Sequence, residues 1–136
     1  MTDRIRSTAG MIAGMTPTLL EGVFVFATIP DPKNAAYVAD AVATVKEAEG
    51  LSLILPIEIA HAHNIPIVFE MQCITLNVYS SLEGVGLTAA VAQSLADEDI
   101  ACNMVAGYHH DHAFVPASDA DRAMAVLKAL QASATA

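Results

Sequence analysis

Residues 73–91 have the sequence CITLNVYSSLEGVGLTAAV, in which a strand pattern runs directly into a helix pattern. Apolar and polar side chains alternate over residues 73–79, which is typical of a strand with one buried face. Ser80 and Glu83 follow with the spacing of a capping box, so a helix is expected to begin there. That helix carries its larger apolar side chains four residues apart, which predicts one buried stripe. The stripe consists of Leu87, Val91 and Leu95.

The rest of the C-terminal half predicts two strands and a second helix. The strands are expected over residues 100–108 and 112–116, and the polar residues 109–111 form the turn between them. Ser118 is a favourable N-cap residue for the final helix. The expected inner face of this helix consists of Ala120, Met124, Leu127 and Leu130.

The N-terminal half repeats this order at an offset of 60 residues. Matched pairs are Pro56 with Pro116, Ile54 with Phe114 and Val45 with Val105. The repeat predicts a strand over residues 42–47, although the alanine-rich residues 35–41 favour a helix that could simply continue. A short helix near the N-terminus and a strand over residues 22–26 come earlier, and residues 66–71 close the first unit.

Two such halves predict an α+β protein with two ferredoxin-like units in tandem, each ordered βαββαβ. Residues 1–72 are expected to form the N-terminal unit, with a short leading helix, and residues 73–136 the C-terminal unit. Each unit then has an antiparallel sheet with helices on one face. Because the strands at residues 23–26 and 53–55 are apolar on both faces, the other face is expected to meet another sheet or another chain.

The composition limits the partners that the chain can bind. It has 136 residues, of which 54% are hydrophobic and 15% charged, and its net charge is −9. Since the 6 basic residues do not cluster, neither nucleic acid nor an anionic membrane surface is expected as a partner. No apolar run approaches the ~18 residues that span a bilayer, and no convincing secretory signal is present, so a cytoplasmic location is expected. High apolarity on a short chain predicts a homodimer.

The segments at residues 74–91, 100–108 and 110–116 together resemble the ACT domain. The chain is most similar to small bacterial ACT-domain proteins of unassigned function, and through them to the paired ACT modules of aspartokinases and of the arginine sensor CASTOR. The resemblance covers about residues 11–130. It implies a regulatory protein that binds a small molecule, expected to be an amino acid, at interfaces between its units.

The resemblance also implies a ligand site in the loop after the first strand of the C-terminal unit and on the following strand. The implied ligand-binding residues are Ser80, Ser81, Leu82, Val85, Gly86, Leu87, Asn103 and Met104. A helix N-terminus has free N–H groups that suit a carboxylate, and glycine lets a ligand approach the backbone. Alternatively, Ser80 and Ser81 only cap the helix, Gly86 only allows close packing, and Asn103 is an edge residue. The first half lacks a comparable glycine loop, so one site per chain is expected.

Residues 109–112, His-His-Asp-His, are the most reactive-looking stretch of the chain. On a strand His110 and His112 share a face and supply half of a structural zinc site, whereas a polar hairpin turn explains the same residues without metal. No nucleophile, base and orienting group assemble from the sequence, so neither catalytic residues nor a cofactor are expected. Cys73 and Cys102 are expected to be unbridged thiols. The alternatives to a ligand-binding regulator are a ligand-free dimerisation module and a metal-binding protein.

Overall fold

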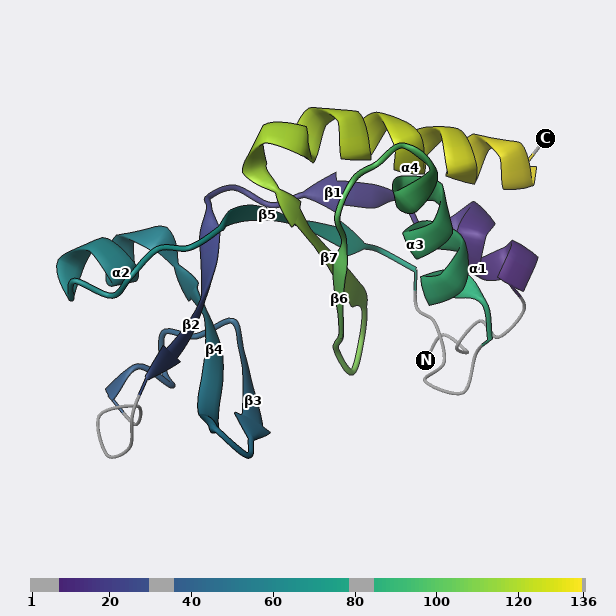
Figure 1. The fold of residues 1–136 in the computed structure, drawn as a ribbon. Helices are drawn as coiled ribbons and strands as arrows, with labels where there is room; N and C mark the ends of the chain where they lie inside the picture. The colour runs from purple at the N-terminus through teal and green to yellow at the C-terminus, as the bar shows by residue number, and fades with distance from the viewer. Residues whose placement is uncertain (1–7, 30–35, 79–84, 136) are drawn as a thin grey trace. The chain divides into compact units, whose positions relative to one another are not determined.

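The computed structural model describes residues 8–29, 36–78 and 85–135, and its ribbon is drawn in Figure 1. Helices and strands alternate along these described residues. They are α1 (Thr8–Gly14), β1 (Pro17–Leu19), β2 (Phe24–Ile29), β3 (Ala43–Glu47), β4 (Gly50–Pro56), α2 (Ile57–Ala62), β5 (Glu70–Leu76), α3 (Leu87–Asp97), β6 (Asn103–Ala106), β7 (Asp111–Pro116), the 3₁₀ turn η2 (Ala117–Asp119) and α4 (Ala120–Thr135).

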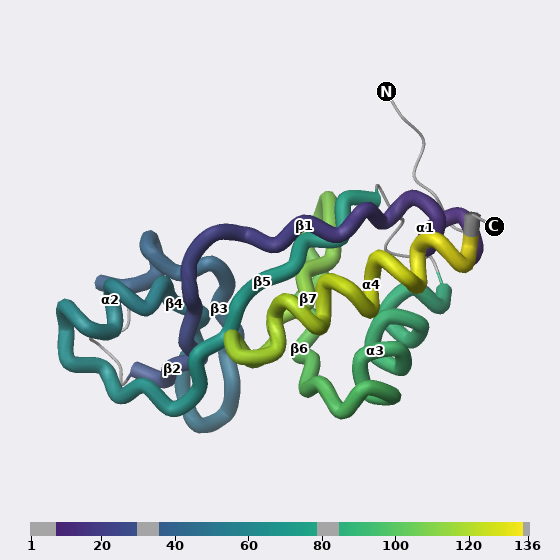
Figure 2. Tube along the Cα trace, turned by 90° about the horizontal axis from the view of Figure 1, so that it is seen from above, coloured from purple at the N-terminus to yellow at the C-terminus, as the bar shows by residue number. Residues whose placement is uncertain are grey.

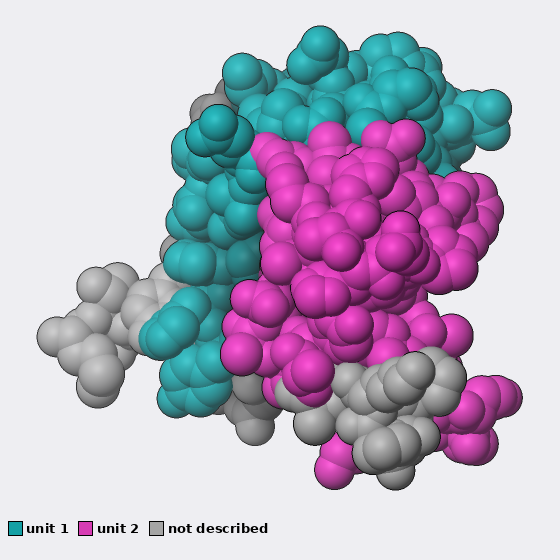
Figure 3. Space-filling model, turned by 90° about the vertical axis from the view of Figure 1, so that its left-hand side faces the viewer, with its two compact units in different colours: residues 1–21, 72–136 teal, residues 22–71 magenta. Residues whose placement is uncertain are grey.

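The described residues divide into two compact units, which are coloured separately in Figure 3. We call residues 22–71 the N-terminal unit, and we call the described parts of residues 1–21 and 72–136 the C-terminal unit. A division after residue 72 was expected, yet residues 8–21 belong to the second compact unit. The reason is local, because β1 pairs with β5 and both Met11 and Met15 are fully buried in the core of that unit.

The C-terminal unit has the strand order β1–β5–β7–β6 with three helices packed on it. Leu19 lies opposite Ile74 and Asn103 opposite Phe114, and both pairings are antiparallel. Figures 1 and 2 show α3 and α4 side by side, and they contact each other. The predicted stripe on α3 is confirmed, since all three of its residues are buried in the core together with side chains of β5, β7 and α4.

The N-terminal unit has the strand order β3–β4–β2–β5, in which the first residues of β5 form the outer strand. Phe24 pairs with Met71, and Val25 pairs with Leu55. Its smaller core consists of Val25, Ile29, Leu53, Leu55 and Ala60. Both units thus have the antiparallel strand order of a ferredoxin-like fold, and the predicted tandem architecture is confirmed.

The repeat at an offset of 60 residues is confirmed at the level of single residues. β3 begins at Ala43 and β6 at Asn103, as the sequence repeat predicted. Pro56 ends β4 with φ −55° and ψ 139°, and Pro116 ends β7 with φ −54° and ψ 136°. Each proline stops its strand and starts a helical turn, because it fixes φ and has no N–H to pair with.

The alanine-rich stretch before β3 was expected to be helical, and over its described residues 36–41 this prediction was wrong. Ala36 belongs to a 3₁₀ turn and residues 37–40 form further turns, in which the Ala41 N–H donates to the Tyr37 carbonyl. The next N–H, that of Val42, instead donates to the Ile54 carbonyl at 2.8 Å and joins the chain to β4. Pairing with a sheet therefore outweighs the helix propensity of three alanines.

Candidate ligand-binding site

Gly86, immediately before α3, has a backbone conformation that residues with a side chain rarely adopt. Its φ is +103°, in the left-handed region, and it occupies the N-cap position of the helix. A Cβ atom built there would lie 2.6 Å from Oγ1 and 2.9 Å from Cγ2 of Thr8. Glycine is therefore required at this position for two separate reasons, its backbone angle and its packing against α1.

The residues around Gly86 are held from both sides. The Thr8 hydroxyl donates a hydrogen bond to the Val85 carbonyl at 2.5 Å, and the Ala90 N–H donates to the Gly86 carbonyl at 2.9 Å. The Leu87 side chain is buried in the core, whereas the Val85 side chain is 75% exposed. Of the predicted loop residues, Leu87 thus anchors the helix and Val85 faces outward.

Asn103 and Met104 lie at the other end of α3. The helix has 11 residues and is therefore about 16 Å long, with Gly86 before its first residue and Asn103 in the strand that follows it. Asn103 is exposed, and Met104 is partly buried against the core of the C-terminal unit. Along the chain, α3 and residues 98–102 therefore lie between the two parts of the predicted ligand set. Ser80, Ser81 and Leu82 lie outside the described residues, as does the predicted capping box.

The histidine hairpin is joined to β5 through its side chains. His110 Nδ1 lies 3.2 Å from the Val78 carbonyl, and His112 Nδ1 lies 3.0 Å from the Thr75 hydroxyl. Burial lowers the pKa of His112, and the neighbouring His110 lowers it further. Burial raises the pKa of Asp111, against the opposing effect of both histidines. Residues 8–29, 36–78 and 85–135 contain no group of three or more His, Cys, Asp or Glu side chains arranged to hold a metal ion.

The two cysteines are free, as predicted. Burial raises the pKa of Cys73 to about 11, while a hydrogen bond with Thr75 acts in the opposite direction. Burial also raises the pKa of Cys102, which is partly buried against the core of the C-terminal unit. Neither thiol is readily ionised, so neither is activated as a nucleophile.

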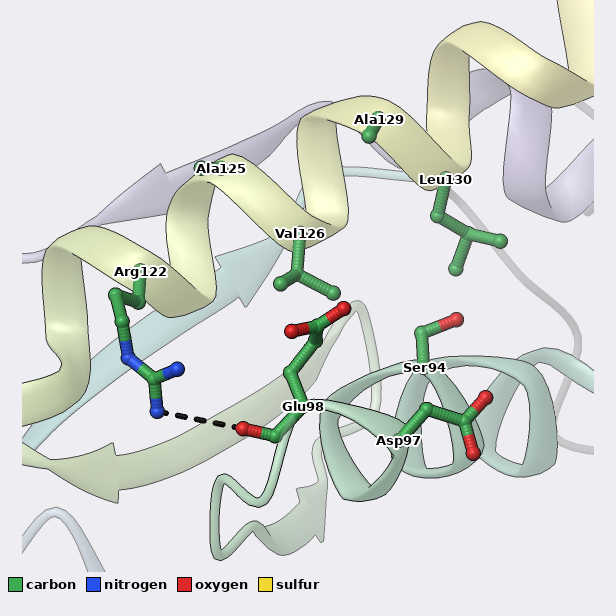
Figure 4. Close-up of a pocket in the computed structure, with 8 residues that line it drawn as sticks. All are labelled: Ser94, Asp97, Glu98, Arg122, Ala125, Val126, Ala129 and Leu130. Carbon is green, nitrogen blue, oxygen red and sulfur yellow. Dashed lines mark hydrogen bonds between the residues drawn. The ribbon is translucent and has the colours of Figure 1, made fainter.

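Sequence reasoning missed a pocket of ≈620 Å³ between α3 and α4, because its walls come from separate helices. Figure 4 shows the apolar side chain of Val126 beside the carboxylate of Glu98, and that of Leu130 beside Ser94. The Arg122 guanidinium donates to the Glu98 carbonyl at 3.3 Å and pairs with the Asp119 carboxylate at 3.4 Å. The arginine thus joins the end of α3 to the start of α4.

Sequence reasoning also missed Thr8, which contacts the predicted ligand loop from 77 residues away. No local motif marks this threonine, since it reaches Val85 only because α1 packs against α3 and α4. For His110 the sequence left both a metal site and a polar hairpin turn open, and the structure places its Nδ1 atom near the carbonyl of Val78, two residues after the end of β5.

Comparisons with known proteins identify the class to which this fold belongs. One family model described as ACT domain matches residues 5–72, and a second with the same description matches residues 68–129. The chain therefore belongs to the ACT domain family and contains two ACT domains in tandem. No curated protein matches the chain.

Several solved structures are similar to the chain over most of their length. A Vibrio cholerae protein of unknown function, described as a possible transport protein, has 36% identity and a TM-score of 0.81, with 90% of this chain and 94% of that chain covered. An Agrobacterium tumefaciens protein has 17% identity and a TM-score of 0.69, with 85% and 87% covered. The regulatory subunit of aspartate kinase from Thermus thermophilus has 12% identity and a TM-score of 0.65, with 87% and 97% covered.

The helices among the described residues are too short or too polar to cross a membrane.

Proposed function

We propose that this chain is a regulatory protein that binds an amino acid in its C-terminal ACT domain and has no catalytic activity. The observation that carries the proposal is the tandem ACT match over residues 5–129, combined with a glycine in the left-handed conformation at the start of α3. The Thermus thermophilus structure of similar fold is a regulatory subunit, which supports a regulatory function here. The regulated partner would recognise a ligand-dependent change of the ACT pair.

The chemistry of the start of α3 suits a carboxylate. The first N–H groups of a helix have no partners within the helix, and the helix dipole adds a partial positive charge. Gly86 has no side chain that could accept hydrogen bonds from these groups. The exposed Val85 side chain gives the same place an apolar surface for the side chain of an amino acid.

We further propose that the ligand binds at an interface, as the resemblance to ACT domains implies, and that the chain is a homodimer in the cytoplasm. In the chain, α3 and residues 98–102 lie between Gly86 and Asn103.

A thermal-shift screen against the twenty L-amino acids, each added singly, tests the proposal. A ligand that binds only the native state increases the free energy of unfolding and therefore raises the melting temperature. At a ligand concentration of a hundred times Kd, the increase in the free energy of unfolding is about 2.7 kcal/mol. We expect one amino acid, or a chemically related pair, to raise it by several degrees. Because the chain has a net charge of −9, we expect a neutral or basic amino acid rather than an acidic one.

A ligand-free dimerisation module is the second candidate function, and one observation favours it. Large apolar side chains stay exposed at or near the edge strands, including Val42 at 51%, Val45 at 58% and Tyr108 at 71%. Such side chains are suited to an interface between copies. A dimer in light scattering together with no response to any amino acid would favour this function over ligand binding.

A further inference from the structure

The pocket between α3 and α4 lies within the C-terminal unit and has one apolar wall. Its volume of ≈620 Å³ falls within the range of about 300–1,000 Å³ that is typical of small-molecule sites. The apolar wall follows one face of α4 from Arg122 to Leu130, a rise of about 12 Å. Val126 and Leu130 are half-buried against the core, whereas Ala125 and Ala129 are exposed and too small to fill the space between the helices.

The opposite wall of the pocket is acidic. It is formed by the end of α3, where Ser94, Asp97 and Glu98 line the pocket. Asp97 Oδ1 accepts a hydrogen bond at 2.7 Å from the amide of Gln93, which is a neutral group. Figure 4 shows the Glu98 carboxylate beside Val126, so a negative charge lies next to the apolar wall. The C-terminal end of a helix also carries a partial negative charge, which adds to that of the two carboxylates.

The basic side chain that lines the pocket is already engaged by other groups. Arg122 pairs with the Asp119 carboxylate at 3.4 Å and donates to the Glu98 carbonyl at 3.3 Å. Among the described residues, neither Asp97 nor Glu98 has an ion-pair partner for its side-chain carboxylate. The pocket therefore combines an apolar wall with an excess of negative charge, and a cation that carries an apolar chain complements both.

We propose that the pocket between α3 and α4 is a second ligand site, which binds a small primary ammonium compound with a short apolar chain. The ammonium group lies against the carboxylates at the end of α3, and the apolar chain lies against Val126 and Leu130. A free amino acid is disfavoured, because its own carboxylate would face Asp97 and Glu98. This site is therefore distinct from the proposed amino-acid site at the start of α3, and it does not depend on that site.

Three probes with the same branched apolar chain test the charge that the pocket prefers. Isoamylamine is a cation at neutral pH, isoamyl alcohol is neutral and isovalerate is an anion. Binding to the full chain is measured by NMR from the methyl signals of Val126 and Leu130. We expect isoamylamine to shift both sets of signals saturably. Since an exposed ion pair contributes about threefold in affinity, two carboxylates should make the Kd of the amine about tenfold lower than that of the alcohol.

Isovalerate should give no saturable shift of these methyl signals, because it would face two like charges. Equal Kd values for the amine and the alcohol would overturn the proposal, since the carboxylates would then have no role. Tighter binding of isovalerate than of isoamylamine would overturn it as well, and so would the absence of a saturable shift with isoamylamine.

Charge variants test the two carboxylates individually. Asp97→Asn and Glu98→Gln should each raise the Kd of isoamylamine about threefold, and the double variant should raise it about tenfold. Asp121→Asn is the matched control, because Asp121 is an exposed carboxylate of α4 that does not line the pocket; it should leave Kd within about twofold of wild type. Asp97 and Glu98 are exposed too, so these substitutions should leave the fold intact. An unchanged Kd in the double variant would overturn the proposal.

A filling variant tests the place of binding. Ala129→Leu puts a large side chain into the pocket at an exposed helical position, and leucine is a good helix former. We expect this variant to lose saturable binding of isoamylamine. Ala96→Leu, at an exposed position of α3 that does not line the pocket, is the matched control and should bind like the wild type. Binding retained in a folded Ala129→Leu protein would overturn the proposal; if that variant unfolds, the charge variants decide.

Two other occupants of the pocket would give different results. If a second copy of the chain covers the pocket, the methyl signals of Val126 and Leu130 shift when the protein is diluted without any probe. If the natural ligand is a lysine of a partner protein, N-acetyl-lysine methylamide binds more tightly than isoamylamine does. We expect neither result, and either one would overturn the assignment to a small ammonium compound.

Discussion

Gly86 and Gly22 have nearly the same φ angle in different surroundings. Their φ values are +103° and +97°, but only at Gly86 would a Cβ atom meet a neighbour, the side chain of Thr8. Left-handed φ values cost a side-chain-bearing residue about 1–3 kcal/mol. Substituting these two glycines can therefore distinguish the cost of backbone strain from the cost of steric overlap within one protein.

We predict that Gly86→Ala destabilises the protein more than Gly22→Ala does. Gly22→Ala should lower the free energy of unfolding by about 1 kcal/mol through strain, and Gly86→Ala by about 2–3 kcal/mol because strain and overlap add. Denaturant titration measures both values. Shortening Thr8 to Ala should return part of the loss in the Gly86→Ala background and none in the Gly22→Ala background. Equal losses in the two single variants would contradict the packing role of Gly86.

His112 carries a prediction about pH. Its pKa is lowered from 6.5 in the folded protein, so the unfolded chain binds more protons just below that pH. Its contribution to stability is complete above pH 6.5 and is lost as the pH falls through the window between the unfolded and folded pKa values. Asp111 has the opposite sign, because its raised pKa lets protonation favour the folded protein as the pH falls.

We therefore expect His112→Asn, which keeps a polar partner for Thr75, to lose less stability than the wild type between about pH 7.5 and pH 5.5. Urea titrations at both pH values measure the difference. Asp111→Asn is the complementary variant, and it should lose more stability than the wild type when the pH is lowered further, toward the ordinary carboxyl pKa of 3.8. A wild-type loss that neither substitution changes would mean that the hairpin does not determine the pH dependence.

At the level of elements, the alternative of a metal site can be tested at the histidine hairpin between β6 and β7. The Nδ1 atoms of His110 and His112 both form hydrogen bonds with groups on or just after β5, which supports a structural role. We predict that EDTA leaves the melting temperature unchanged and that His110→Ala does not alter the response to the chelator. A fall of several degrees in EDTA that zinc reverses would instead establish a metal site, because metal binding is coupled to folding.

The elements also show how far sequence reasoning extends. The offset of 60 residues predicted β3, although local propensity favoured a helix there, because a repeat reports which residues occupy equivalent places in a sheet. β1 was not foreseen as a strand of the C-terminal unit, because its pairing with β5 joins segments from opposite ends of the chain. Thr8 was missed for the same reason, since the contact of α1 with α3 has no local signal.

The candidate site was predictable only in part. The resemblance to ACT domains pointed to Val85, Gly86 and Leu87, and the structure gives Gly86 the special conformation that its glycine allows. Periodicity also predicted the burial of Leu87. The contact of Thr8 with Gly86 and Val85 was not predictable, because a motif gives residue types but not which distant segments pack against it.

At the level of the whole molecule, we predict that the chain forms a homodimer in solution. Large apolar side chains remain exposed in the single chain, among them Val68 at 68%, Phe69 at 65% and Val85 at 75%. Their burial between copies would contribute about 25 cal/mol for each Å² removed from water. Light scattering should give a mass twice the 14.2 kDa of one chain. A mass of one chain at high micromolar concentration would contradict this prediction.

Isothermal titration calorimetry with the amino acids that raise the melting temperature tests the central claim most directly, because it measures affinity and stoichiometry together. Among the described residues, a glycine at the N-cap of a helix of 11 residues is found in the C-terminal unit, at Gly86, so we predict saturable binding with one ligand per chain. Gly22→Ala, which lies outside the site, should bind with the wild-type affinity and stoichiometry. The absence of saturable binding for all twenty amino acids, at protein and ligand concentrations that detect a Kd of about 1 mM, would contradict the claim that this ACT protein is an amino-acid-binding regulator.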